Sequence, residues 1–100
     1  MLYRIRRYDA VPENLTAFHE FFNAYLLPVQ LRHGARLIGR WETEAHEVMA
    51  VWEYDDEVAY RRIADAVAND PDAAVAQQVR ASLGTLFTDK HETFARSTLT

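Results

Sequence analysis

The segment from Gly39 to Tyr54, GRWETEAHEVMAVWEY, constrains the fold more than any other part of the sequence. Two runs rich in aromatic and β-branched residues flank a short polar stretch, which is the pattern of a β-hairpin. The runs cover residues 35–44 and 47–54, with Ala45-His46 as the connection. Because a lone hairpin is marginally stable at best, the rest of the chain must add strands and cover at least one face of the sheet.

Both tryptophans of the chain lie in this hairpin. If Glu44 pairs with Glu47, Trp41 lies opposite Ala50 and shares a face of the sheet with Trp52. A shift of one residue would put the two tryptophans on opposite faces, so the prediction depends on the register of the hairpin.

The remaining segments supply one more strand on each side and three helices. We expect a strand at 2–8, a helix at 13–33, a helix that begins at Asp55-Asp56, a helix at 72–83 and a strand at 91–98. Pro28 should bend the first helix, and Gly34 should end it. The second helix is expected to turn an apolar stripe inward, formed by Val58, Ala59, Ile63, Ala66 and Val67.

The order of these elements is β-α-β-β-α-α-β. With right-handed crossovers it predicts a ferredoxin-like α+β fold, with a four-stranded antiparallel sheet in the order 4-1-3-2 and helices on one face. One hundred residues are enough for one domain, so we expect a single domain over residues 1–100.

The other face of the sheet has no helix to cover it. We expect the alternating residues of the second hairpin strand to lie there, with partners from neighbouring strands: Val48, Ala50, Trp52, Tyr54, Trp41, Tyr8, Arg4 and Arg6. Large aromatic side chains bury about 150–250 Å² each, and a soluble monomer rarely exposes a patch that large. The sequence therefore predicts a homodimer through the helix-free face, with a lined cavity between the sheets.

Two groups of residues on this predicted face are candidate binding residues. Arg4 and Arg6 could capture a carboxylate or phosphate, with Tyr8 adding a hydroxyl group. The alternative is that these arginines form structural ion pairs, with Glu42, Glu53 or Glu92 as partners. The aromatic group could wall a pocket for a flat apolar ligand or simply form the core of the dimer; its members are Trp41, Trp52 and Tyr54.

The same positions carry a family resemblance. The motifs are Tyr3-x-x-Arg6-x-Tyr8 followed by Pro12, then Pro28, His33-Gly34, Gly39-x-Trp41-x-Thr43-Glu44 and Trp52-x-Tyr54. In their order and spacing they resemble the NIPSNAP family. The resemblance implies a dimeric α/β-barrel, and it implies roles exerted through partners rather than a defined chemistry. The chain departs from the family pattern at Ala50, where the resemblance leads us to expect a histidine.

Composition argues against several classes of function. The net charge of −4 argues against nucleic-acid binding, which needs a basic patch. The absence of cysteine excludes disulfides and thiolate metal sites, and no apolar run reaches the length of a membrane span. The arginines at the amino end do not fit a signal peptide, so we expect a cytoplasmic protein.

The histidines do not form a metal-binding pattern. His19-Glu20 begins like a zinc-protease motif, but Asn23 stands where the second histidine belongs, and His91-Glu92 fails in the same way at Ala95. We therefore predict no metal and no cofactor.

Two hypotheses for function remain. The first is a homodimeric module that binds a small molecule or a partner. The second is a cofactor-independent monooxygenase or isomerase that acts on a small aromatic substrate, with Trp52, Tyr54 and Arg6 lining its site. A haem-degrading variant of the second hypothesis is disfavoured, because the helix EVAYRRIADAVA offers no axial histidine.

Overall fold

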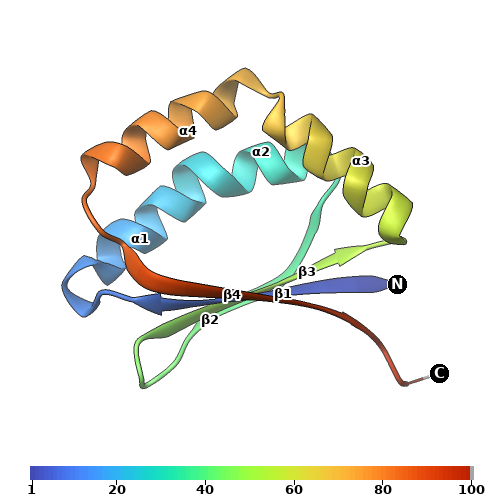
Figure 1. The fold of residues 1–100 in the computed structure, drawn as a ribbon, viewed down its shortest axis with the longest axis horizontal. Coiled ribbons are helices and arrows are strands. Elements are labelled where there is room, and N and C mark those ends of the chain that lie inside the picture. The colour runs from blue at the N-terminus through green and yellow to red at the C-terminus, as the bar shows by residue number, and fades with distance from the viewer. Residues whose placement is uncertain (100) are drawn as a thin grey trace.

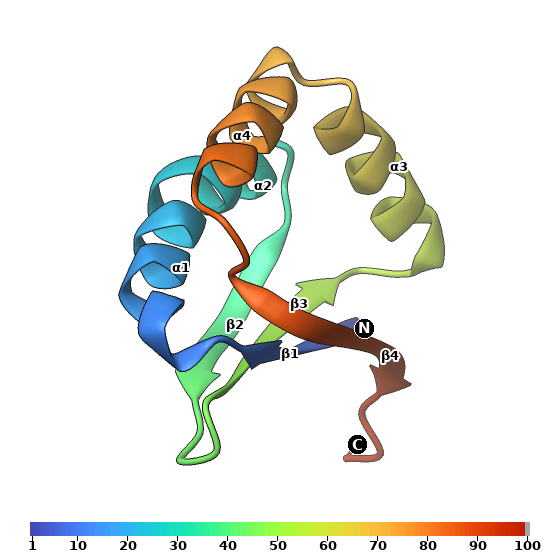
Figure 2. The same cartoon turned by 60° about the vertical axis from the view of Figure 1, so that its left-hand side comes forward.

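The protein folds into one antiparallel sheet covered on one side by helices, as a computed structural model of residues 1–99 shows (Figures 1 and 2). Its elements are β1 (Leu2–Ala10), η1 (Pro12–Asn14), α1 (Leu15–Phe21), η2 (Phe22–Leu26), α2 (Leu27–Arg32), β2 (Arg36–Glu42), β3 (Glu47–Tyr54), α3 (Glu57–Ala68), α4 (Pro71–Ser82) and β4 (Phe87–Arg96). The strand order is β2-β3-β1-β4. The predicted ferredoxin-like α+β fold and strand order are therefore confirmed.

The sheet of a single chain is open. β2 and β4 form its two edges, so the closed barrel that the family resemblance implies is not formed within one chain. Among residues 1–99, no helix combines the length and the apolar character needed to cross a membrane.

The first long helix contains a π-helical turn. The helical segment runs from Leu15 to Arg32, and its middle part, Phe22–Leu26, is π-helical. The amide of Leu27 consequently donates to the carbonyl of Phe22, five residues back, rather than to that of Asn23, four residues back, as it would in an α-helix. Pro28, which has no N–H to donate, is the second residue after this turn.

Aspartates begin the two following helices. The Asp56 carboxylate accepts a hydrogen bond of 2.8 Å from the amide of Ala59 at the start of α3. The Asp70 carboxylate accepts one of 2.9 Å from the amide of Asp72 at the start of α4. Both side chains pair amides that the helix itself leaves without an acceptor.

Two local predictions are wrong. β4 begins at Phe87 and not at residue 91. Val58 is 76% exposed instead of facing inward. It stands five residues before the buried Ile63, which places it roughly 140° around the helix from that side chain.

The register of the hairpin also differs from the prediction, because its turn is one residue longer. The Thr43 amide donates to the Glu47 carbonyl over 2.8 Å, so the connection has three residues. The last of them, His46, adopts a left-handed backbone with φ of 60°, as is common in three-residue hairpins. Trp41 therefore lies opposite Met49 rather than Ala50, and the two tryptophans lie on opposite faces of the sheet.

A bulge shifts the pairing once more. Leu37 pairs with Trp52 and Gly39 pairs with Val51, which leaves Ile38 as the extra residue of β2. The Trp41 ring lies over Gly39, where an added Cβ would stand only 2.5 Å from the ring atom Cη2. Glycine is thus the residue that lets this ring lie flat along the strand.

The assignment of the sheet faces is corrected as well. Val48, Ala50, Trp52 and Tyr54 are all buried, and they face the helices instead of the helix-free side. Their partners on β1, which are Tyr8, Arg6 and Arg4, share this helix-facing side. The alternating residues Met49 and Val51 on the helix-free side are also apolar, so the alternation within β3 does not reveal which face the helices cover.

Candidate functional site

A cavity of about 330 Å³ lies between the sheet and the helices. Its size is within the range of about 300–1,000 Å³ typical of small-molecule sites. Strand residues of the lining are Arg4, Arg6, Tyr8, Arg40, Ala50, Trp52, Phe87 and Lys90. Residues from the helices and loops complete it: Phe18, Phe21, Phe22, Tyr25, Leu26, Val29, Gln30, Val67, Ala68, Ala73, Ala76, Gln77, Arg80 and Leu86.

Four of the six candidate residues predicted from sequence line this cavity. Arg4, Arg6, Tyr8 and Trp52 are brought together there, although on the opposite side of the sheet from the one expected. Ala50 lies among them, opposite Arg6, and its methyl group leaves open the space that a larger side chain would fill.

The other two candidate residues lie elsewhere. Tyr54 is 1% exposed and packs edge-on against Tyr60, with 5.1 Å between the ring centroids. Burial raises the pKa of its hydroxyl group, although the nearby Arg4 cation acts in the opposite direction. Trp41 stands on the helix-free face and is 48% exposed.

The cavity lining is rich in positive charge. Its cationic residues are Arg4, Arg6, Arg40, Arg80 and Lys90, and no described lining residue is acidic. Glu92 stands nearby on β4, where it hydrogen-bonds Arg4 and lies 3.9 Å from the Nε of Arg6. The ion-pair alternative therefore holds for Arg4 and, at the longer distance, for Arg6, whose Nε has no hydrogen-bond partner among residues 1–99.

Burial and pairing act differently on two of these guanidinium groups. Burial alone would lower the pKa of Arg4, but the hydrogen bond and charge of Glu92 outweigh it and raise the pKa. At Arg40 burial is the largest influence, and the pKa is lowered. Arg40 remains a cation at neutral pH, since an arginine stays protonated there, but this cation is incompletely compensated.

Arg40 is held by a short chain of polar contacts. Its Nη1 donates to the Nδ1 of His19 over 2.7 Å, and the Nε2 of His19 lies 2.7 Å from a Glu42 carboxylate oxygen. The guanidinium also stacks on Phe22, 4.2 Å from the ring centroid, and on Phe18 at 5.0 Å. These contacts leave the Nη2 of Arg40 buried without a partner.

Sequence reasoning missed Arg40, Arg80 and Lys90. Arg40 carries a signal, because it stands one residue before Trp41 and so lies on the other face of β2. The predicted register assigned that face to the helices, but the site was sought on the opposite side. Lys90 pairs with Tyr8 only because β4 begins earlier than predicted.

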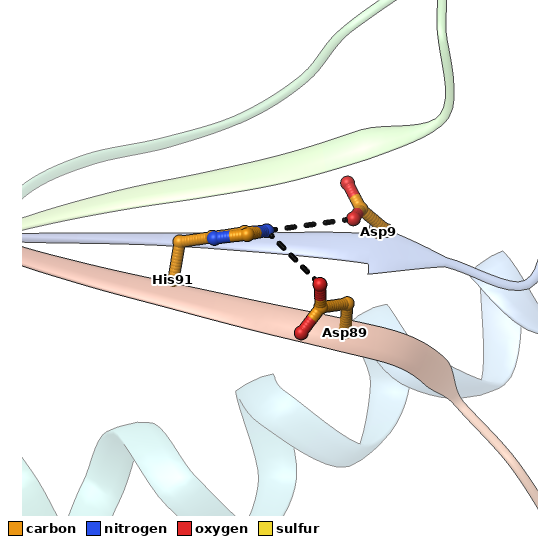
Figure 3. A group of neighbouring side chains, drawn as sticks. All are labelled: Asp9, Asp89 and His91. Atoms are coloured by element: carbon orange, nitrogen blue, oxygen red, sulfur yellow. Dashed lines mark ion pairs between the residues drawn. The ribbon is translucent and has the colours of Figure 1, made fainter.

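A separate cluster lies on the helix-free face, where Asp9, Asp89 and His91 meet (Figure 3). The Nε2 of His91 is 3.6 Å from an oxygen of Asp9 and 3.4 Å from one of Asp89. Arg7 lies 3.3 Å from the other oxygen of Asp9 and already supplies positive charge there. We assign this cluster as surface ion pairs.

The centre of the helix-free face is apolar. Its side chains come from three strands and are half-buried or exposed: Tyr3, Ile5, Trp41, Met49 and Val51. Ion pairs border it, Arg7 with Glu47 at one end and Arg36 with Glu53 at the other.

Comparison with known families agrees with this architecture. The NIPSNAP family profile matches residues 3–95. The chain belongs to the NIPSNAP family. The predicted resemblance is thereby confirmed, and it extends beyond the motifs in the first half of the sequence.

Solved structures share the fold at low sequence identity. An uncharacterised NIPSNAP domain protein from Burkholderia xenovorans superposes with a TM-score of 0.86 at 20% identity, over 99% of this chain and 96% of that one. A protein from Agrobacterium tumefaciens reaches 0.85 at 16% identity, over 99% and 95%. An antibiotic biosynthesis monooxygenase reaches 0.66 at 10% identity, over 97% and 98%. No protein with a curated description matches the sequence.

Proposed function

We propose that this NIPSNAP-family domain binds a small molecule in the cavity between its sheet and helices. The ligand has a flat apolar body and carries at least one acidic group. The single observation that supports this proposal is the set of five cationic side chains around a cavity with no described acidic lining residue, in a protein whose formal net charge is −4.

Charge and shape each contribute to this assignment. Uncompensated cations are costly in a partly buried site, and a ligand anion would compensate them. The aromatic rings of Phe18, Phe22 and Trp52 offer flat apolar surfaces to the body of the ligand.

Native mass spectrometry of the purified protein is the first test, because a retained ligand would give its mass directly. The second is calorimetric titration with 2-naphthoate and with the neutral 2-naphthamide, which has nearly the same shape. We expect the acid to bind at least tenfold more tightly than the amide. Absence of any adduct, together with no binding of either compound, would refute the assignment.

We further infer that the domain is a homodimer through its helix-free face. The support is the apolar centre of that face between bordering ion pairs of both signs, which two copies could match against each other. Trp52, which was predicted to lie in this interface, packs in the core under the helices, so a substitution of Trp52 would perturb the core and not the dimer.

Light scattering tests the dimer with two matched variants. Val51→Lys places a charge at the centre of the helix-free face, whereas Val58→Lys makes the same change at an exposed helix position. We expect a dimeric wild type, a monomeric Val51→Lys variant and a dimeric Val58→Lys variant. A monomeric wild type, or a dimer that tolerates Val51→Lys, would contradict the inference.

The second candidate is cofactor-independent oxygenation or isomerisation of a small aromatic substrate. It is favoured by the likeness in fold to an antibiotic biosynthesis monooxygenase. The described lining offers tyrosines but no histidine or carboxylate as a general base. We therefore prefer the binding function to the catalytic one. Oxygen uptake with an electron-rich phenol, lost on Tyr8→Phe, would favour this second candidate.

A further inference from the structure

Two guanidinium nitrogens in the cavity lack partners. The Nε of Arg6 and the Nη2 of Arg40 are both buried, and neither has a hydrogen-bond acceptor among residues 1–99. Buried donors nearly always have a partner in folded proteins, so two such atoms in one cavity point to an acceptor that the described part of the chain does not supply.

Both arginines flank the same small residue. Arg6 is the partner of Ala50 across β1 and β3, and Arg40 is its partner across β2 and β3. Neighbouring strands are about 4.8 Å apart, so the two backbone positions are roughly 10 Å apart with one methyl group between them. The long side chains on either side can reach a group placed above that methyl.

The contacts of Arg40 fix its orientation and the tautomer of His19. An arginine has no acceptor atom, so Nδ1 of His19 must accept the hydrogen bond from Arg40. The imidazole is then neutral, and its proton is on Nε2, from which it is donated to Glu42. One edge of the guanidinium is held by this pair while Nη2 is left free.

The two arginines differ in what compensates them. Glu92 hydrogen-bonds Arg4 and reaches Arg6 only at 3.9 Å. Glu42 reaches Arg40 only through the neutral ring of His19. Each guanidinium therefore keeps capacity for an external anion.

We propose that the acidic group of the ligand, a carboxylate or a phosphate, binds above Ala50 between Arg6 and Arg40. His19 and Glu42 act as positioning residues that hold Arg40 for this contact. The proposal rests on the function proposed above and names the part of the cavity that selects the anion. A forked guanidinium on each side suits the paired oxygens of such groups.

We call the pair Arg6 and Arg40, on either side of Ala50, the clamp. Calorimetric titration with 2-naphthoate, 2-naphthyl phosphate and 2-naphthamide tests it. Arg6→Gln and Arg40→Gln should each lower the affinity for both anions at least tenfold and the affinity for the amide less than twofold. Arg40→Lys keeps the charge without the fork and should give a smaller loss. Ala50→Leu should abolish the preference for the anions while leaving all the charges in place. The tighter of the two anions identifies the acidic group that the site prefers.

Arg36→Gln is the matched control. Arg36 lies on β2, as Arg40 does, but it pairs with Glu53 and Asp55 outside the cavity. An equal loss in this variant would mean general electrostatic attraction and would overturn the clamp. Equal affinity of wild type for the acid and the amide would also overturn it, while the cavity itself would remain a binding site. No binding of any compound would overturn both proposals.

The positioning role has its own readout. His19→Phe removes the acceptor and should weaken the anions several-fold, whereas His19→Gln can still accept from Arg40 and donate to Glu42 and should restore most of the affinity. The ¹⁵N shifts of His19 should show a protonated Nε2 and an unprotonated Nδ1. The opposite tautomer, or equal affinities in the two variants, would refute this role.

Discussion

The two tryptophans of the hairpin should differ sharply in their contribution to stability. Trp52 is 4% exposed and packs against Phe22, with ring centroids 6.1 Å apart. Burial of about 250 Å² at about 25 cal/mol per Å² gives an upper limit of about 6 kcal/mol, and mutational series for large aromatic residues give about 3–5 kcal/mol. We therefore expect Trp52→Ala to lower the free energy of unfolding by about 3–5 kcal/mol.

Trp41 provides the matched comparison within the same hairpin. Trp41 is 48% exposed in a single chain, and it lies on the face of the sheet that no helix covers. Within a single chain, half the burial and no enclosed cavity give an expected loss of about 1–2 kcal/mol for Trp41→Ala, to which contacts across the proposed dimer would add.

Urea denaturation followed by circular dichroism measures both losses. The experiment is run at two protein concentrations tenfold apart, so that self-association shows as a shift of the midpoint with concentration. In the Val51→Lys background, which is expected to be monomeric, acrylamide should quench the emission of Trp41 in a Trp52→Phe variant more than that of Trp52 in a Trp41→Phe variant. Equal losses for the two alanine variants in that monomeric background would refute the assigned faces and the three-residue turn.

Further predictions concern the bulged strand and the acid dependence of stability. Gly39→Ala should lower the free energy of unfolding by about 1–3 kcal/mol, because the new methyl group displaces the Trp41 ring. A changed tryptophan emission spectrum with a lower urea midpoint would support this prediction. An unchanged spectrum and midpoint would contradict it. The pKa of Asp70 is lowered by the amide of Asp72 and then by His33, so the native state favours the carboxylate. Its contribution to stability should be complete at neutral pH and lost as the pH falls below about 4 and through the folded pKa. Asp70→Asn should therefore destabilise the protein at neutral pH and flatten its acid titration, whereas an acid titration parallel to that of wild type would show that this carboxylate is not linked to folding.

Much of the candidate site could be anticipated without the structure. Six candidate residues were selected from sequence in two groups on one predicted face, and the structure brings four of them to one cavity: Arg4, Arg6, Tyr8 and Trp52. They remain together because all four share one set of alternating positions across β1 and β3. A change of face moves such a set as a whole and does not scatter its members.

Arg40 and its support could not be selected in that way. His19 lies on α1 and Glu42 on β2, and their contact with Arg40 depends on how the first helix crosses the sheet. The three side chains are drawn from two elements, and their meeting is not contained in the periodicity of either one.

The sequence by itself determined the order of the elements, their approximate bounds and the strand order. These features follow from local periodicity and from the handedness of crossovers, which act within short stretches or on connections. The tertiary structure decided the register of the hairpin and the face that the helices cover. A single extra turn residue at Glu44–His46 and the bulge at Ile38 set the register. Both faces of β3 are apolar at their centre, so only packing against the helices selects Trp52 for the interior and leaves Met49 and Val51 on the open side.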